Sequence, residues 1–143
     1  MEEVVCDIKI NDLIELDVDE EIMKSYPKYL KMKYIIISMF FTWLNENYSG
    51  LIYFSKLFSQ LAVKRHNFFL NFQSSGAPDI IILHKNNQYS AMAIYLIMNT
   101  EGTYGKEKKR ESIKKLVSMN YFAIEANNIN QIKNYFLEYL NNY

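Results

Sequence analysis

Asp79 is the residue whose type and position most favour chemistry. It follows Pro78 and precedes the apolar run Ile80-Ile81-Ile82-Leu83, where a carboxylate contributes nothing to apolar packing. A carboxylate at the entrance of a buried strand can ligate a divalent cation or exchange a proton with a substrate. Either chemistry needs further polar groups beside Asp79, and other parts of the chain must supply them.

Other kinds of catalytic or metal site find no support in the sequence. The two histidines, His66 and His84, are far apart, and the single cysteine, Cys6, is distant from both, so no zinc-ligand spacing exists. Gly76, Gly102 and Gly105 fall in ordinary turns, and no serine lies in a nucleophile elbow. We expect these histidines and the cysteine to be structural.

Asp79 is positioned by a predicted hairpin. Residues 74–78 form a turn, the apolar run 80–83 follows, residues 85–88 reverse the chain, and a second apolar run returns over 89–98. This pattern predicts two buried antiparallel strands. The hairpin is the expected centre of the fold.

The segments before the hairpin are more varied. Residues 1–22 are acidic and alternate locally, which fits either short edge strands or an extended arm. Leu30, Tyr34, Ile37, Phe41 and Leu44 recur at helical spacing and predict a helix from Pro27 to residues 47–50. Residues 51–63 predict a second, shorter helix, and residues 66–72 a strand.

The segments after the hairpin predict a helix, a strand and a closing helix. Residues 106–119 form an amphipathic helix with Ile113, Leu116 and Val117 facing inward, residues 121–126 a strand, and residues 131–140 a helix capped by Asn128 or Asn130. The whole predicts one α/β domain over residues 23–143, with a central mixed sheet of about four strands flanked by helices.

The formal net charge of zero hides an asymmetry. The first 21 residues hold nine acids and one base, whereas the remaining 122 residues hold fifteen bases and seven acids. Six bases of the helix over 106–119 could contact the phosphates of a nucleic acid by charge alone; they are Lys106, Lys108, Lys109, Arg110, Lys114 and Lys115. A solvated helix face, partly compensated by Glu107 and Glu111, is the equally weighted alternative.

Composition and the N-terminal sequence favour an intracellular protein. A lone cysteine fits a reducing compartment, the acidic N-terminus does not read as a signal peptide, and the apolar run 34–44 is too short to span a bilayer. The abundance of Asn, Ile, Lys and Tyr is typical of AT-rich genomes, including those of large DNA viruses. We therefore expect the cytoplasm or nucleus of a host cell if the protein is viral.

A family resemblance rests on the order of these features. The Gly76-Ala77-Pro78-Asp79 turn, its apolar strand, the returning strand, the glycine loop, the charged helix and the strand near residues 120–124 resemble the virus-type replication-repair nuclease domain (VRR-NUC), a branch of the PD-(D/E)XK nuclease superfamily. Residues 20–143 can be laid along that domain. The resemblance implies a restriction-endonuclease-like core.

The same resemblance implies a degenerate active site. In the family, the aspartate after the proline and a Glu-x-Lys on the next strand hold Mg²⁺ and neutralise charge. Asp79 matches the aspartate, but Ile94-Tyr95-Leu96-Ile97 stands where Ile-Glu-Leu-Lys is expected, and the family's glutamine is replaced near Lys108 or Lys109. We expect no catalytic residue, no metal ligand and no cofactor.

Two functions follow as expectations. The first is a catalytically inactive nuclease-fold protein of viral or mobile-element origin, which binds DNA through the basic helix or binds a protein partner, and which could form a homodimer. The alternative is an active Mg²⁺- or Mn²⁺-dependent DNA endonuclease with Asp79 as metal ligand. In this alternative Glu101 or Glu21 replaces the missing acid, and Lys106 supplies the positive charge of the missing lysine. No membrane partner is expected.

Overall fold

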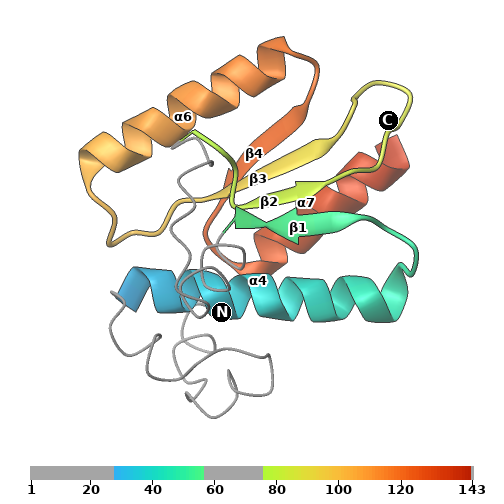
Figure 1. The fold of residues 1–143 in the computed structure, drawn as a ribbon, viewed down its shortest axis with the longest axis horizontal. Helices are drawn as coiled ribbons and strands as arrows, with labels where there is room; N and C mark the ends of the chain where they lie inside the picture. The colour runs from blue at the N-terminus through green and yellow to red at the C-terminus, as the bar shows by residue number, and fades with distance from the viewer. Residues whose placement is uncertain (1–27, 57–75, 143) are drawn as a thin grey trace, which may run out of the picture.

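The computed structural model describes residues 28–56 and 76–142. The elements in chain order are α4 (Lys28–Asn47), β1 (Tyr53–Ser55), β2 (Ile80–Ile82), β3 (Met92–Leu96), α6 (Thr103–Ser118), β4 (Phe122–Ala126) and α7 (Ile129–Asn142). The fold is α/β, with these helices packed against a four-stranded mixed sheet (Figure 1).

The sheet has the strand order β1-β2-β3-β4. β1 pairs antiparallel with β2, and β2 antiparallel with β3, with Ile80 opposite Ile94. β3 and β4 are parallel, with Ile94 opposite Ile124. A parallel pair needs a crossover connection, and α6 supplies it.

The helices cover the two faces of the sheet differently. Figure 1 shows α6 on one side and α4 with α7 on the other. The main core lies between the sheet and the α4–α7 layer, where Ile80, Ile82, Met92, Ile94 and Leu96 pack against residues of both helices. A smaller cluster joins Ala93, Tyr95 and Ala123 to Ile113 and Leu116 of α6. β3 is therefore buried on both faces.

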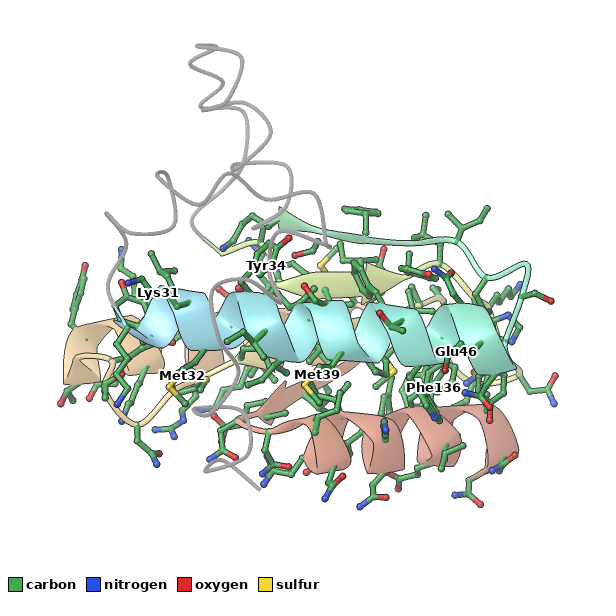
Figure 2. All side chains as sticks on the ribbon, turned by 90° about the horizontal axis from the view of Figure 1, so that it is seen from below. Lys31, Met32, Tyr34, Met39, Glu46 and Phe136 are labelled. Atoms are coloured by element: carbon green, nitrogen blue, oxygen red, sulfur yellow. The ribbon has the colours of Figure 1, made fainter. Side chains whose placement is uncertain are left out.

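Helix α4 is buried continuously over residues 33–38 and again at Phe40 and Leu44. Within this set Tyr34, Ile37, Phe40 and Leu44 follow one another at helical spacing along one face. Figure 2 views the molecule from the α4 side, with α7 lying alongside and Phe136 between the two helices. The Phe136 ring meets that of Phe40 edge-on at 6.0 Å. Among the described residues, no helix is long and apolar enough to cross a membrane.

Polar residues end one helix and begin the next. Asn120 adopts a left-handed conformation with φ of 70°, and the N–H groups of Asn120 and Tyr121 donate to Val117 and Leu116, as at many helix ends. Asn128 caps α7, because its Oδ1 accepts the N–H of Gln131 at 3.0 Å. The predicted Asn128 cap is confirmed.

Most of the predicted architecture is confirmed. The hairpin, the mixed four-stranded sheet and the helices at 28–47, 103–118 and 129–142 are present. The predicted helix over 51–63 is wrong at residues 53–55, which form β1, because pairing with β2 outweighs the helical spacing of the apolar residues around it. Val117 does not face inward, since it is 53% exposed. The predicted arm over 1–22 and the predicted strand over 66–72 lie outside the described residues, as do Cys6 and His66.

Candidate functional site

Five charged side chains from separate parts of the chain line one pocket of about 260 Å³. They lie at the start of α4, after β1, before β2, in the β3–α6 connection and on α6. Tyr29 and Leu30 complete the lining, and the charged residues are Lys33, Lys56, Asp79, Glu101 and Lys109. The beginning of α4 and the β3–α6 connection lie on the same side of the molecule (Figure 1).

Asp79 is fixed by the two strands beside it. Its N–H donates to the Ile94 carbonyl at 3.0 Å, which extends the β2–β3 ladder by one residue. Its Oδ2 accepts the N–H of Leu96 at 2.7 Å, and the residue is only 4% exposed. The carboxylate is therefore buried and oriented by the backbone of β3.

Glu101 reaches the same pocket from the β3–α6 connection. Its N–H donates to the Met98 carbonyl, and its Oε1 accepts the N–H of Met98 at 3.2 Å, so the connection folds back on itself. Oε1 also accepts Lys33 Nζ at 2.8 Å, and Oε2 accepts Lys109 Nζ at 2.5 Å. Both oxygens of Glu101 are thus engaged by ammonium groups.

Lys33 lies between the two carboxylates. Its Nζ lies 2.8 Å from Glu101 Oε1 and 4.0 Å from Asp79 Oδ1. The side chains of Lys33, Asp79 and Glu101 are only 5–7% exposed. The ammonium also lies 5.7 Å from the centre of the Tyr29 ring. A cation belonging to the chain itself occupies the space between Asp79 and Glu101.

Lys109 and Lys56 close the sides of the pocket. Lys109 Nζ donates to the Leu96 carbonyl at 3.1 Å as well as to Glu101. Lys56 Nζ donates to the Ala77 carbonyl at 3.0 Å. With three ammonium groups and two carboxylates, the cluster has a formal charge of +1.

The ion pairs within the cluster shift the pKa values of its side chains. Burial alone would raise the pKa of Glu101, but the hydrogen bonds from Lys109 and Lys33 outweigh it and lower the pKa below 4.5. Burial alone would lower the pKa of Lys33, but the charge of Asp79 and the bond to Glu101 raise it above 10.5. Burial lowers the pKa of Lys109, as does the neighbouring Lys33, against the opposing effect of Glu101.

The second strand of the hairpin carries a neutral phenol and an apolar residue at the two positions where the resemblance led us to look for an acid and a base. Tyr95, which stands at the expected glutamate, lies on the α6 side of the sheet and donates its hydroxyl to the Gly76 carbonyl at 2.6 Å. Burial, together with the charge of Asp79, raises the pKa of Tyr95 to about 12. Ile97, which stands at the expected lysine, is 7% exposed.

The cluster does not fit the Mg²⁺ that the alternative of an active endonuclease requires. Mg²⁺ requires near-ideal octahedral oxygen ligands at ~2.1 Å, whereas Glu101 already accepts two ammonium groups and Asp79 accepts a backbone N–H. Within residues 28–56 and 76–142, no three His, Cys, Asp or Glu side chains gather where they could hold a metal ion. A divalent cation would have to displace Lys33 and Lys109.

The structure brings two of the predicted site residues together and places a third elsewhere. Asp79 and Glu101 are brought together around Lys33, whereas Glu21 lies outside the described residues. Lys106 is not at this cluster: its Nζ is 3.4 Å from the Asn99 carbonyl, and it lines a different pocket with Arg110 and Glu125. Lys109 occupies the place that Lys106 was expected to fill.

The six bases of α6 do not form one face. Lys109 lies in the charged pocket, and Arg110 Nε donates to Glu125 at 3.1 Å. Lys108, Lys114 and Lys115 are exposed to solvent. Lys108 also lies 5.0 Å from the centre of the Tyr104 ring.

Sequence reasoning missed Lys33 and Lys56. The signal for Lys33 is its place in the buried stripe of α4, where Leu30, Lys33 and Ile37 follow one another at helical spacing. A lysine at such a position requires a buried partner. Lys56 has no comparable signal, because the spacing of the apolar residues over 51–63 predicts a helix and not a strand that ends beside Asp79.

Comparisons with known proteins identify no relative. No family model, no curated protein and no solved structure matches the chain.

Proposed function

We propose that this chain is a nuclease-fold protein, of viral or mobile-element origin, that has lost metal-dependent catalysis and acts by binding nucleic acid. The observation that carries the proposal is the position of Lys33, whose ammonium lies 2.8 Å from Glu101 Oε1 and 4.0 Å from Asp79 Oδ1. An ammonium in this position supplies positive charge but cannot lower the pKa of a bound water as a divalent metal does. The chain therefore binds the negatively charged nucleic acid but does not hydrolyse it.

The order of elements supports the resemblance to the VRR-NUC domain. The Pro-Asp turn precedes β2, the antiparallel β3 returns beside it, and the glycine-containing connection leads through α6 to the parallel β4. These are the features on which the resemblance rests. The acid and base expected on the second strand are replaced by Tyr95 and Ile97, which supports the loss of catalysis.

The exposed bases of α6 are the proposed contact for the phosphate backbone. Lys108, Lys114 and Lys115 are exposed, whereas Lys109 and Arg110 are paired with carboxylates. Glu107 and Glu111 interrupt this surface, so we expect moderate affinity without base readout. Association should weaken steeply with salt, because phosphate contacts release counterions.

Fluorescence anisotropy and a cleavage assay test the proposal together. We expect labelled single-stranded and duplex DNA to bind at about 50 mM salt and to lose most of that affinity at about 200 mM. The triple variant Lys108→Glu, Lys114→Glu and Lys115→Glu should bind more weakly, whereas the control Lys85→Glu, an exposed residue of the β2–β3 turn, should not. Absence of binding at low salt would refute the proposal.

The active endonuclease is the second candidate, and one observation favours it. Asp79 and Glu101, which are well separated in sequence, both contact Lys33 in one pocket, so two acids do converge. Incubation with branched and single-stranded DNA and Mg²⁺ or Mn²⁺ distinguishes the candidates. Cleavage that disappears in Asp79→Ala would establish the enzyme and exclude the proposal.

A protein-interaction role has separate support. Ile52 and Leu83 are 64% and 51% exposed and are joined by a hydrogen bond from the Leu83 N–H to the Ile52 carbonyl at 2.8 Å. Phe54 beside them is 48% exposed. Light scattering after size exclusion tests for a homodimer, and a monomer that remains monomeric at high concentration would exclude self-association.

A further inference from the structure

We propose that the pocket lined by Lys33, Lys56 and Lys109 binds a phosphate group without a divalent cation. This inference rests on the proposed nucleic-acid-binding function and assigns one site to it. Lys33, whose ammonium lies between Asp79 and Glu101, supplies the fixed positive charge of the site. The ligand is a phosphate monoester or diester, whether at an end of a nucleic acid or free in solution.

The charge of the pocket favours an anion. Three ammonium groups face two carboxylates, and both carboxylates are held against the protein. Asp79 is bound by the Leu96 N–H, and Glu101 by Met98, Lys33 and Lys109. The acids therefore fix the lysines in place, and the surplus positive charge remains for a ligand.

The lysines also retain donors for that ligand. An ammonium has three N–H groups. The described contacts of Lys56 use one of them, on the Ala77 carbonyl, and those of Lys109 use two, on the Leu96 carbonyl and Glu101. Two hydrogens of Lys56 and one of Lys109 are left to bind phosphate oxygens by charge-assisted hydrogen bonds.

The pocket has room for such a group. Its volume of about 260 Å³ is several times the ~30 Å³ that one water molecule occupies in the liquid. A phosphate with part of its hydration shell fits this space. Tyr29 and Leu30 form an apolar side of the pocket, and partial exclusion of water there strengthens the interaction of the lysines with an anion.

Isothermal titration of the full chain with inorganic phosphate tests the site. The titration is run in EDTA at constant ionic strength. Lys56→Met removes the whole ammonium, including the two N–H groups left for the ligand, and keeps an unbranched side chain that is one atom shorter. Glu101→Gln removes a negative charge from the pocket. Lys85→Met, at an exposed residue of the β2–β3 turn, is the matched control, and thermal melting checks that every variant is folded.

Lys56→Met and Glu101→Gln should change the affinity for phosphate in opposite directions. Lys56→Met should weaken phosphate binding about tenfold, and Glu101→Gln should strengthen it by a similar factor, because each changes one unit charge within reach of the anion. Lys85→Met should bind phosphate as the wild type does. No binding in EDTA, weaker binding by Glu101→Gln, or equal losses in Lys56→Met and Lys85→Met would each overturn the proposal.

Two oligonucleotides of one sequence, with a 5′-phosphate or a 5′-hydroxyl, identify the source of the ligand. Preference for the phosphorylated end that disappears in Lys56→Met assigns the site to a nucleic-acid terminus. If the two oligonucleotides bind equally and inorganic phosphate also binds, the site takes a backbone phosphate or free phosphate. Failure of both oligonucleotides to bind contradicts the proposed function, whereas binding of both without any effect of Lys56→Met contradicts only the phosphate site.

Discussion

Lys33 Nζ lies 2.8 Å from Glu101 Oε1, which joins the first described helix to the connection between β3 and α6. The two side chains are 5% and 7% exposed, so the pair is shielded from water. Asp79 lies on the other side of Lys33, with its Oδ1 at 4.0 Å. This single ammonium links α4 to both acids of the pocket.

Replacement of Lys33 by Met should destabilise the fold. Loss of one partner of a buried ion pair leaves the remaining charges less compensated, and we expect the free energy of unfolding to fall by about 3 kcal/mol. Lys31→Met, on the same helix (Figure 2), should change it by less than about 0.5 kcal/mol. Urea unfolding measures both, and equal losses in the two variants would contradict the buried pair.

Stability should fall in acid partly through Glu101. Its pKa is lowered in the folded state by Lys109 and Lys33 against the opposing effect of burial, so its contribution is present above pH 4.5 and is lost as the pH falls through the lower folded pKa. Asp79 is the other acid facing this group. In Glu101→Gln the loss of stability below pH 4.5 should be smaller than in the wild type.

Urea unfolding at a series of pH values from neutral to acidic checks this dependence. The exposed Glu46→Gln at the end of α4 is the control and should retain the wild-type profile. Glu101→Gln with an unchanged acid profile would show that Glu101 is not paired as described.

Tyr95 should remain protonated in alkali when ordinary tyrosines ionise. Burial raises its pKa to about 12, whereas an unfolded tyrosine ionises near 10. The folded state therefore loses stability as the pH rises above 10, because the unfolded chain releases this proton first. The difference in ultraviolet titration between wild type and Tyr95→Phe should show the missing phenol ionising near 12, and ionisation near 10 would contradict its burial.

Phe136→Ala should be strongly destabilising. Phe136 is fully buried and contacts the rings of Phe40, Trp43 and Tyr48 between α4 and α7. Loss of the ring should cost about 3–5 kcal/mol, measured by urea unfolding. Tyr104→Ala, where the side chain is 71% exposed, should cost less than about 0.5 kcal/mol.

The sequence predicted the elements with strong local patterns. The stripe of α4, the Pro-Asp turn and the apolar runs of β2 and β3 have unambiguous spacing, and the structure confirms them. β1 could not be predicted, because residues 53–55 lie within a longer segment whose apolar residues have helical spacing. Its strand identity comes from pairing with Ile80–Ile82, which is a tertiary contact.

The candidate site was predicted only in part, for a similar reason. Asp79 is marked by the proline before it, and Glu101 is the first charged residue after β3. Lys33 and Lys56 reach them through packing of α4 and through the β1–β2 pair. Lys106 and Lys109 are nearly one helical turn apart, so the choice between them depends on the orientation of α6 against the sheet, which the spacing of its apolar residues did not fix.

Manganese binding tests the central claim most directly. The claim is that the Lys33 ammonium, and not a divalent cation, lies between Asp79 and Glu101. Titration calorimetry with Mn²⁺ should show no specific binding to the wild-type chain and no change on replacing Asp79 by Ala. Stoichiometric Mn²⁺ binding that Asp79→Ala and Glu101→Gln both abolish would show that the two acids hold a metal after all, and would contradict the account.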